Sequence, residues 1–242
     1  MQITDLSRAR GIGANCLLVE AGPFRLIVDA GIDPKRVGLG ATPQFKHVED
    51  GTVDFILLTH CHLDHLGALP LAARRHPDAT ILATRASAQL APRMLRNSTN
   101  VMKRQREEQR IPEYPLYTHG EIDWVEGRIF PMKEGVTKAF DKKGETLEIT
   151  FFRAGHIVGA AGLRIVYRDK SLFLTGDVLF HDMTTLPGAD FPRERCDVLV
   201  TETTRGLTSR QPKGTRPPEL NRLLRTIDDT LGGGARVLVP AF

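Results

Sequence analysis

The chain contains 242 residues, of which 41% are hydrophobic and 26% are charged. This composition is that of a globular protein, and the length suffices for one main α/β domain with a sizeable core. The sequence has no run of about 20 apolar residues, which excludes a membrane-spanning helix. Because the first residues do not resemble a signal peptide either, we expect a cytoplasmic location.

The cysteines and the charge balance narrow the class of protein only slightly. Cys16, Cys61 and Cys196 are odd in number and far apart in the chain, which argues against a disulfide framework. The formal net charge of +4 permits a polyanionic partner without requiring one.

The first third of the chain alternates between strand-like and helix-like segments. Two apolar runs on either side of Ala21-Gly22-Pro23 predict a β-hairpin, and Pro77 ends a predicted helix. The strands are predicted at 16–20, 24–29, 53–59 and 79–84, and the helix at 66–75.

A long basic segment follows, at 93–110, and it has the pattern of an amphipathic helix. Its apolar residues are spaced to face one way on a helix: Met94, Leu95, Val101 and Met102. Two interpretations remain open for its charges. Charge runs are usually solvated helix surfaces, whereas a basic face beside a functional site can contact a phosphate backbone.

The second half begins with a mixed, proline-containing stretch and then predicts a sheet. Strands are predicted at 147–154, 162–167, 171–175, 196–201 and 236–239, and a helix at 218–231. The composition shifts towards Arg, Pro and Gly from Gly206 onwards.

Three histidines and an aspartate lie within six residues directly after the strand predicted at 53–59. Side chains two residues apart at a strand end point the same way, so His60 and His62 can bind one metal ion. Asp64 and His65 lie where the chain turns towards a helix and can bind a second ion nearby. Two metal ions about 3.5–4 Å apart are suited to phosphodiester hydrolysis.

Two further candidate ligands also follow predicted strands. His156 stands among small residues that let the backbone approach closely, and the carboxylate of Asp177 could bridge two metals. Cys61 lies between two candidate ligands, but we expect its side chain to face away from them and to behave as a small buried hydrophobe. The remaining histidines lack such neighbours, and we expect surface or core positions for His47, His76, His119 and His181.

These motifs together resemble the metallo-β-lactamase superfamily, and within it the β-CASP branch of nucleic-acid hydrolases. The segments that carry the resemblance are, in order, 28–31, 60–65, 154–160, Asp177, 201–206 and 238–242. The resemblance implies an α/β fold, an incomplete metallo-β-lactamase αββα sandwich over 1–205. It implies the start of a truncated β-CASP-like domain over 206–242.

The same resemblance implies the roles of the site residues. One zinc ion would be held by His60, His62 and His156, and the other by Asp64 and His65, with Asp177 bridging them. Asp29 would orient a ligand by hydrogen bonding. The surroundings of His156 are similar to those of RNA-processing members, which implies cleavage of RNA phosphodiester bonds by a hydroxide that bridges the metals. Single-stranded RNA is the expected partner, with a homodimer or a processing complex as further possibilities.

Glu202 has two interpretations at this point. In the family the corresponding acidic residue supports a histidine of the inserted domain that helps to protonate the leaving group, which would make Glu202 catalytic alongside Asp64 and Asp177. The alternative is a carboxylate in a salt bridge at the end of a strand.

The chain departs from the family pattern at its end, because relatives continue and return with another metal-binding histidine. We therefore expect a fragment whose three-histidine site binds zinc well and whose second site is weakened. Two alternatives to a ribonuclease stay open. One is a small-molecule hydrolase such as a thioesterase or lactonase, and the other is a non-catalytic scaffold in an RNA-processing complex.

Overall fold

The computed structural model describes residues 1–8, 11, 13–204, 206–207 and 216–239. The chain divides into two compact units, Met1–Thr204 and Arg205–Phe242. The first unit contains two sheets and four α-helices, and the described part of the second contains one helix. The expectation that the second unit begins a β-CASP-like domain stays a prediction.

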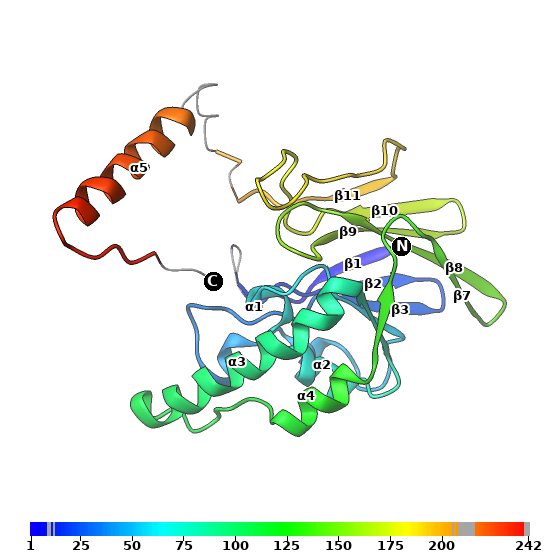
Figure 1. The fold of residues 1–242 in the computed structure, drawn as a ribbon. Coiled ribbons are helices and arrows are strands. Elements are labelled where there is room, and N and C mark those ends of the chain that lie inside the picture. Colours follow the sequence, from blue (N-terminus) through cyan, green and yellow to red (C-terminus); the bar gives the residue numbers. More distant parts are fainter. Residues whose placement is uncertain (9–10, 12, 205, 208–215, 240–242) are drawn as a thin grey trace. The chain divides into compact units, whose positions relative to one another are not determined.

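The first sheet has six strands in the order β1-β2-β3-β4-β5-β6; its first three strands are labelled in Figure 1. Strands β1 to β3 pair antiparallel, whereas β3 to β6 are parallel. The predicted hairpin is confirmed, since Ala21 pairs with Phe24 across its turn. The strands are β1 (Gln2–Asp5), β2 (Leu17–Ala21), β3 (Phe24–Val28), β4 (Phe55–Leu57), β5 (Thr80–Thr84) and β6 (Ile129–Met132).

The helices of the first unit cover one face of this sheet. All four contribute buried residues to a core that also contains Ile27 and Ile56 from the sheet. They are α1 (Leu63–Leu66), α2 (Leu69–Arg75), α3 (Arg85–Gln109) and α4 (His119–Glu126), with two short 3₁₀ turns, η1 (Gly38–Ala41) and η2 (Phe45–His47).

The second sheet packs on the other face of the first. Because side chains alternate along a strand, Leu26 and Val28 point away from the helices and enter a second core with Ile149 and Leu163. This sheet has the order β11-β10-β9-β8-β7, antiparallel except for the parallel pair β10 and β11. Its strands are β7 (Lys138–Lys142), β8 (Glu145–Arg153), β9 (Ala161–Tyr167), β10 (Lys170–Leu174) and β11 (Val198–Val200).

Three predictions about the helices and strands of the first unit are wrong in detail. The helix predicted at 66–75 is two helices, because Pro70 lies in the first turn of α2, where its ring and missing N–H start a helix but do not continue one. The strand predicted at 53–59 is limited to β4. Val101 was predicted on the apolar face of the helix at 93–110, but it is 45% exposed, because α3 turns it away from the buried side on which Met102 lies.

Several elements escaped sequence reasoning. These are β1, α4, β6 and β7. In α4, Thr118 and Glu121 form a capping box, a signal that was present in the sequence but lay among prolines.

The second unit contains α5 (Arg216–Gly232), in agreement with the helix predicted at 218–231. The strand predicted at 236–239 is wrong, since these residues form no regular structure. A strand needs a partner for its backbone groups, and no strand is present among the described residues of this unit.

All three cysteines are free, as expected. None of the described helices is long and apolar enough to cross a membrane.

Candidate metal centre

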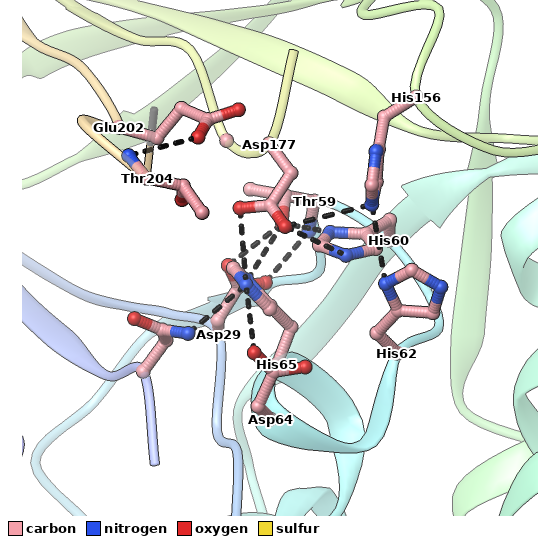
Figure 2. A network of polar contacts seen from close by, with 12 residues as sticks. Asp29, Thr59, His60, His62, Asp64, His65, His156, Asp177, Glu202 and Thr204 are labelled. Atoms are coloured by element: carbon pink, nitrogen blue, oxygen red, sulfur yellow. Dashed lines mark hydrogen bonds and ion pairs between the residues drawn. The ribbon is translucent and has the colours of Figure 1, made fainter. Parts of the chain in front are cut away.

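The candidate ligands lie at the carboxyl ends of strands from both sheets (Figure 2). The segment with His60, His62, Asp64 and His65 follows β4, whereas His156 follows β8 and Asp177 follows β10. The two sheets pack face to face with these ends together, and a hydrogen bond from Ala161 N to Thr59 O joins them there. The fold thereby brings together residues that are more than a hundred positions apart in the chain.

Four side chains form a group that could hold one metal ion. A ligand atom from each of His60, His62, His156 and Asp177 lies within 4.8 Å of the others. The Nε2 atom of His156 is 3.2 Å from Nδ1 of His62 and 3.5 Å from Oδ2 of Asp177. The Nε2 atom of His60 is buried and has no hydrogen-bond partner among the described residues. An orphaned buried nitrogen beside two imidazoles and a carboxylate fits a zinc ion, for which this is a suitable donor set.

A second, smaller group adjoins the first. The Nε2 atom of His65 is 3.4 Å from Oδ1 of Asp177 and 3.8 Å from Oδ2 of Asp64. Asp177 thus presents one oxygen to each group, as a bridging ligand does. With two unshared ligands, the second group has fewer donors than the first, and the number of metals bound stays a prediction.

Asp29 contacts Nδ1 of His65, whereas Asp64 and Asp177 face its Nε2. The carboxylate of Asp29 accepts hydrogen bonds from the backbone N and the Oγ1 of Thr59, at 2.8 and 2.7 Å, and lies 2.7 Å from Nδ1 of His65. When Nδ1–H donates to a carboxylate, Nε2 carries the free lone pair, and Nε2 is the atom that faces Asp64 and Asp177. Asp29 therefore holds a proton on Nδ1 and leaves Nε2 as the atom that would bind a metal.

The backbone around α1 fixes this geometry further. Ala30 N donates to His65 O, and Ile32 N donates to Leu63 O. The two segments touch so closely at Gly31 that a Cβ atom there would lie 1.6 Å from Asp64 O. Glycine at this position is therefore required for α1 to dock behind the metal-binding side chains.

The histidines of the two groups differ in their affinity for protons. Burial lowers the pKa of His60 to about 2, and it also lowers the pKa of His62, so both are neutral imidazoles near pH 7. Burial opposes protonation of His65 too, but the carboxylates of Asp29 and Asp177 raise its pKa to about 10. The protein thus favours a positive charge beside Asp177, which a bound divalent cation would supply.

The loop that carries His156 is tied to the amino-terminal end of α3. Gly159 O accepts hydrogen bonds from Thr84 Oγ1 and Ser87 Oγ, at 2.8 and 2.9 Å. The Sγ atom of Cys61 donates to Ser87 O. Ser87 therefore contacts both metal-binding loops. Cys61 is buried, as expected, and is not among the four grouped side chains; burial raises the pKa of its thiol to about 11.

Glu202 follows β11 and contacts the backbone beside Asp177. Its Oε1 accepts a hydrogen bond from Val178 N at 2.9 Å, and its Oε2 accepts a longer one from Thr204 N at 3.4 Å. Among the described residues it forms these backbone contacts rather than the salt bridge considered above. Its role opposite a histidine of another domain stays a prediction.

Sequence reasoning missed three residues that contribute to the centre. Thr59 was part of the motif but had no role assigned to it, although its backbone N and hydroxyl bind Asp29. Asn15 precedes β2, and its Nδ2 lies 3.0 Å from Nε2 of His65. Neither Asn15 nor Ser87 stands at a diagnostic spacing, so only the fold could reveal them. None of the four histidines that were set aside is in the group of candidate ligands: His47, His119 and His181 are exposed, and His76 is buried.

Open space adjoins the second group of ligands. A cavity of about 240 Å³ reaches His65 and Asp177 and is also lined by Asn15. A further cavity, of about 510 Å³, is bordered by Asp64, Asp177 and Thr203. Within the first unit, the centre is therefore open on the side on which Asp64 lies.

Comparison with known proteins finds similar solved structures and similar sequences. A solved metallo-β-lactamase from Cronobacter sakazakii is 16% identical and covers 79% of this chain and 74% of its own, with a TM-score of 0.48.

Relatives with functional names match the whole chain but are much longer. An "Endoribonuclease ysh1" of Schizosaccharomyces pombe is 28% identical, and the "Transcription termination factor FttA" of Methanocaldococcus jannaschii is 29% identical. "Cleavage and polyadenylation specificity factor 73" of Drosophila melanogaster is 26% identical. All of this chain aligns in each case, but it spans only 30, 37 and 34% of their respective lengths.

The family model described as "Metallo-beta-lactamase superfamily" matches residues 9–240. This match covers nearly the whole chain, and it confirms the fold class that the motifs around His60, His156 and Asp177 predicted. The protein belongs to the metallo-β-lactamase superfamily.

Proposed function

We propose that this chain carries the zinc centre of a ribonuclease that hydrolyses phosphodiester bonds in RNA. The observation that supports this most directly is the convergence of His60, His62, His156 and Asp177 on one point. The name of the relative in Schizosaccharomyces pombe, an endoribonuclease, favours RNA as the substrate over a small ester. In this proposal the second unit begins a β-CASP-like domain, the RNA is single-stranded, and the protein acts in the cytoplasm, alone, as a homodimer or in a processing complex.

The residues divide between two zinc ions. His60, His62 and His156 would hold the first, Asp64 and His65 the second, and Asp177 would contact both through its two oxygens. When bound, zinc lowers the pKa of water and stabilises negative charge on a phosphate group.

The protein's own groups prepare the centre for this chemistry. Asp29 holds a proton of His65 on Nδ1, which leaves Nε2 as the atom that would bind a metal in place of its own proton. Glu202 accepts a hydrogen bond from Val178 N and so fixes the backbone directly after Asp177. Thr84 and Ser87 hold the loop of His156 through Gly159 O. These contacts reduce the motion of the ligands before substrate arrives.

One comparison of substrates tests the proposal. Zinc-loaded protein is incubated with labelled single-stranded RNA, the matching DNA and a thioester. We expect the RNA to be cleaved, and we expect the double variant His62→Ala, Asp64→Ala to lose this activity, because it removes one ligand from each group. A matched control, His47→Ala with His119→Ala, removes two exposed histidines away from the centre and should cleave normally.

The outcomes separate the candidate functions. RNA cleavage that survives in the His62→Ala, Asp64→Ala variant would contradict the metal mechanism. Thioester hydrolysis without RNA cleavage would identify a small-molecule hydrolase instead. Absence of all activity in a zinc-loaded protein extended beyond Phe242 would favour a non-catalytic scaffold.

A further inference from the structure

The positive charge of the chain is concentrated on one helix. Helix α3 with its C-terminal cap, 85–110, contains seven basic and two acidic residues, a net charge of +5. The other 216 residues contain 26 basic and 27 acidic residues, a net charge of −1. The surplus of basic residues is therefore a property of α3 and not of the surface in general.

Most of these cations are not used inside the protein. Arg96 forms ion pairs with Asp123 and Glu126 of α4. The other six cations of 85–110 form no ion pair with any described residue. Arg106 and Arg110 stand at the carboxyl end of the helix, where cations stabilise the helix dipole. Arg93, Lys103 and Arg104 are exposed along the helix and have no such structural explanation.

The exposed face of α3 has the composition of a surface for phosphates rather than for a folded protein. Between the cations it presents Gln89, Asn97 and Asn100, all exposed. Arg, Lys, Asn and Gln side chains are the usual contacts to nucleic-acid backbones, whereas the centre of a protein interface is apolar and depleted in lysine. On this face only Val101 is an exposed large apolar residue.

Helix α3 also begins beside the metal centre. Ser87 in its first turn donates to Gly159 O, three residues after His156, and accepts a hydrogen bond from Cys61, which lies between two ligands. With 25 residues the helix is about 38 Å long, since each residue adds about 1.5 Å. Its other side is held against the core by Leu95 and Met102. The basic face is thus a rigid, elongated surface that begins beside the centre and extends away from it.

We propose that the exposed face of α3 around Arg93, Lys103 and Arg104 binds the phosphate backbone of single-stranded RNA, outside the metal centre. This inference rests on the proposed function and adds to it the surface that holds the substrate. Since phosphate contacts carry no sequence information, this face contributes affinity and orients the RNA strand along α3, but does not select a sequence.

The test measures binding without cleavage. Binding of a fluorescent oligouridylate is followed by anisotropy with EDTA present, for the wild type and for the triple variant Arg93→Gln, Lys103→Gln, Arg104→Gln. A control variant, Lys35→Gln, Lys46→Gln, Lys143→Gln, removes the same charge from exposed positions outside α3. Unchanged thermal unfolding midpoints verify that both variants fold.

The expected result follows from counterion release. Each phosphate contact contributes about 0.7 to the slope of log affinity against log salt for single strands, so the triple variant should lose about 2 from that slope. Between 50 and 200 mM salt, the wild type should therefore lose about 20-fold more affinity than the triple variant. The control variant should keep most of the wild-type slope.

Three outcomes would overturn the inference. Equal slopes for the wild type and the triple variant would show that α3 does not contact RNA, and would leave the proposed function intact if the wild type cleaves RNA. If the wild type cleaves RNA and the two triple variants lose equal affinity relative to it, the effect comes from overall charge and not from α3. Preferential binding of polyglutamate, abolished in the α3 variant alone, would identify the face as a surface for an acidic protein.

Discussion

Replacing Gly159 by alanine tests whether the anchor on α3 positions His156. Gly159 has a φ of +81°, and a Cβ atom there would lie 2.7 Å from both the backbone N and the Oγ of Ser87. Because the backbone N cannot move aside as a side chain can, the loop itself must shift. The loop is closed by a hydrogen bond from Ala154 N to Ala160 O, so a shift at Gly159 also displaces His156.

The magnitude can be estimated with a matched control. Gly144 has a similar φ of +77°, but a Cβ atom there would meet nothing within 4 Å. Gly144→Ala should therefore cost only the left-handed strain, about 1–2 kcal/mol. Gly159→Ala bears the same strain and also weakens the two hydrogen bonds to Gly159 O, each of which contributes about 1 kcal/mol. We expect Gly159→Ala to lower the free energy of unfolding by about 3–4 kcal/mol.

The functional effect should be specific to Gly159. A displaced His156 should weaken zinc binding by about 10- to 100-fold, the usual effect of disturbing the groups that orient a ligand. Urea unfolding in EDTA measures stability, and competition with a chromophoric chelator measures zinc affinity. If Gly159→Ala and Gly144→Ala lost equal stability and both kept wild-type zinc affinity, the loop would not depend on its contact with Ser87, and the reasoning would be refuted.

Three further predictions concern residues around the centre and in the core. Asp29→Asn presents an amide N–H to Nδ1 of His65, which places the proton on Nε2. Zinc titration should then show a second site weakened by about 10- to 100-fold and an unchanged first site. Equal loss at both sites would indicate a general structural defect. Glu202→Gln keeps an acceptor for Val178 N and so should retain zinc stoichiometry and stability within about 1 kcal/mol by urea unfolding; a large loss of either would assign the negative charge a structural role. Burial lowers the pKa of His76 below its ordinary 6.5, so as pH falls below about 6.5 the unfolded state takes up a proton that the native state does not, and stability decreases. The free energy of unfolding of the wild type should then fall more steeply than that of His76→Leu, by at most about 1.4 kcal/mol per pH unit, and parallel pH profiles of the two would contradict this.

The sequence predicted which side chains converge, because the spacing of most of the candidate ligands depends on local geometry. His60, His62, Asp64 and His65 lie in one turn after β4, so the motif specifies most of its own arrangement. His156 and Asp177 could be added because each follows a recognisable strand. The strands of the sandwich were predictable for the same reason, since burial on both faces produces apolar runs at β3, β9 and β10.

The contacts that support the ligands could not be predicted, because they join segments that are distant in the chain. Asn15 reaches His65 across 50 positions, and Ser87 reaches Gly159 across 72. Their sequence surroundings are ordinary for a strand entrance and for a helix start. Strand β7 escaped for a different reason: its five residues are at most half-buried, so packing leaves little hydrophobic pattern to detect.

The two sheets contribute unequally to one cluster, and this has a consequence for folding. His60, His62 and His65 follow a strand of the first sheet, whereas His156 and Asp177 follow strands of the second. A metal bound by both sets is a cross-link between the layers, and its binding free energy adds to the stability of their packing. Metal binding should therefore occur late in folding, after the two sheets have formed and packed against each other. Chelation of the metal should weaken the packing between the two sheets before the strands within either sheet separate.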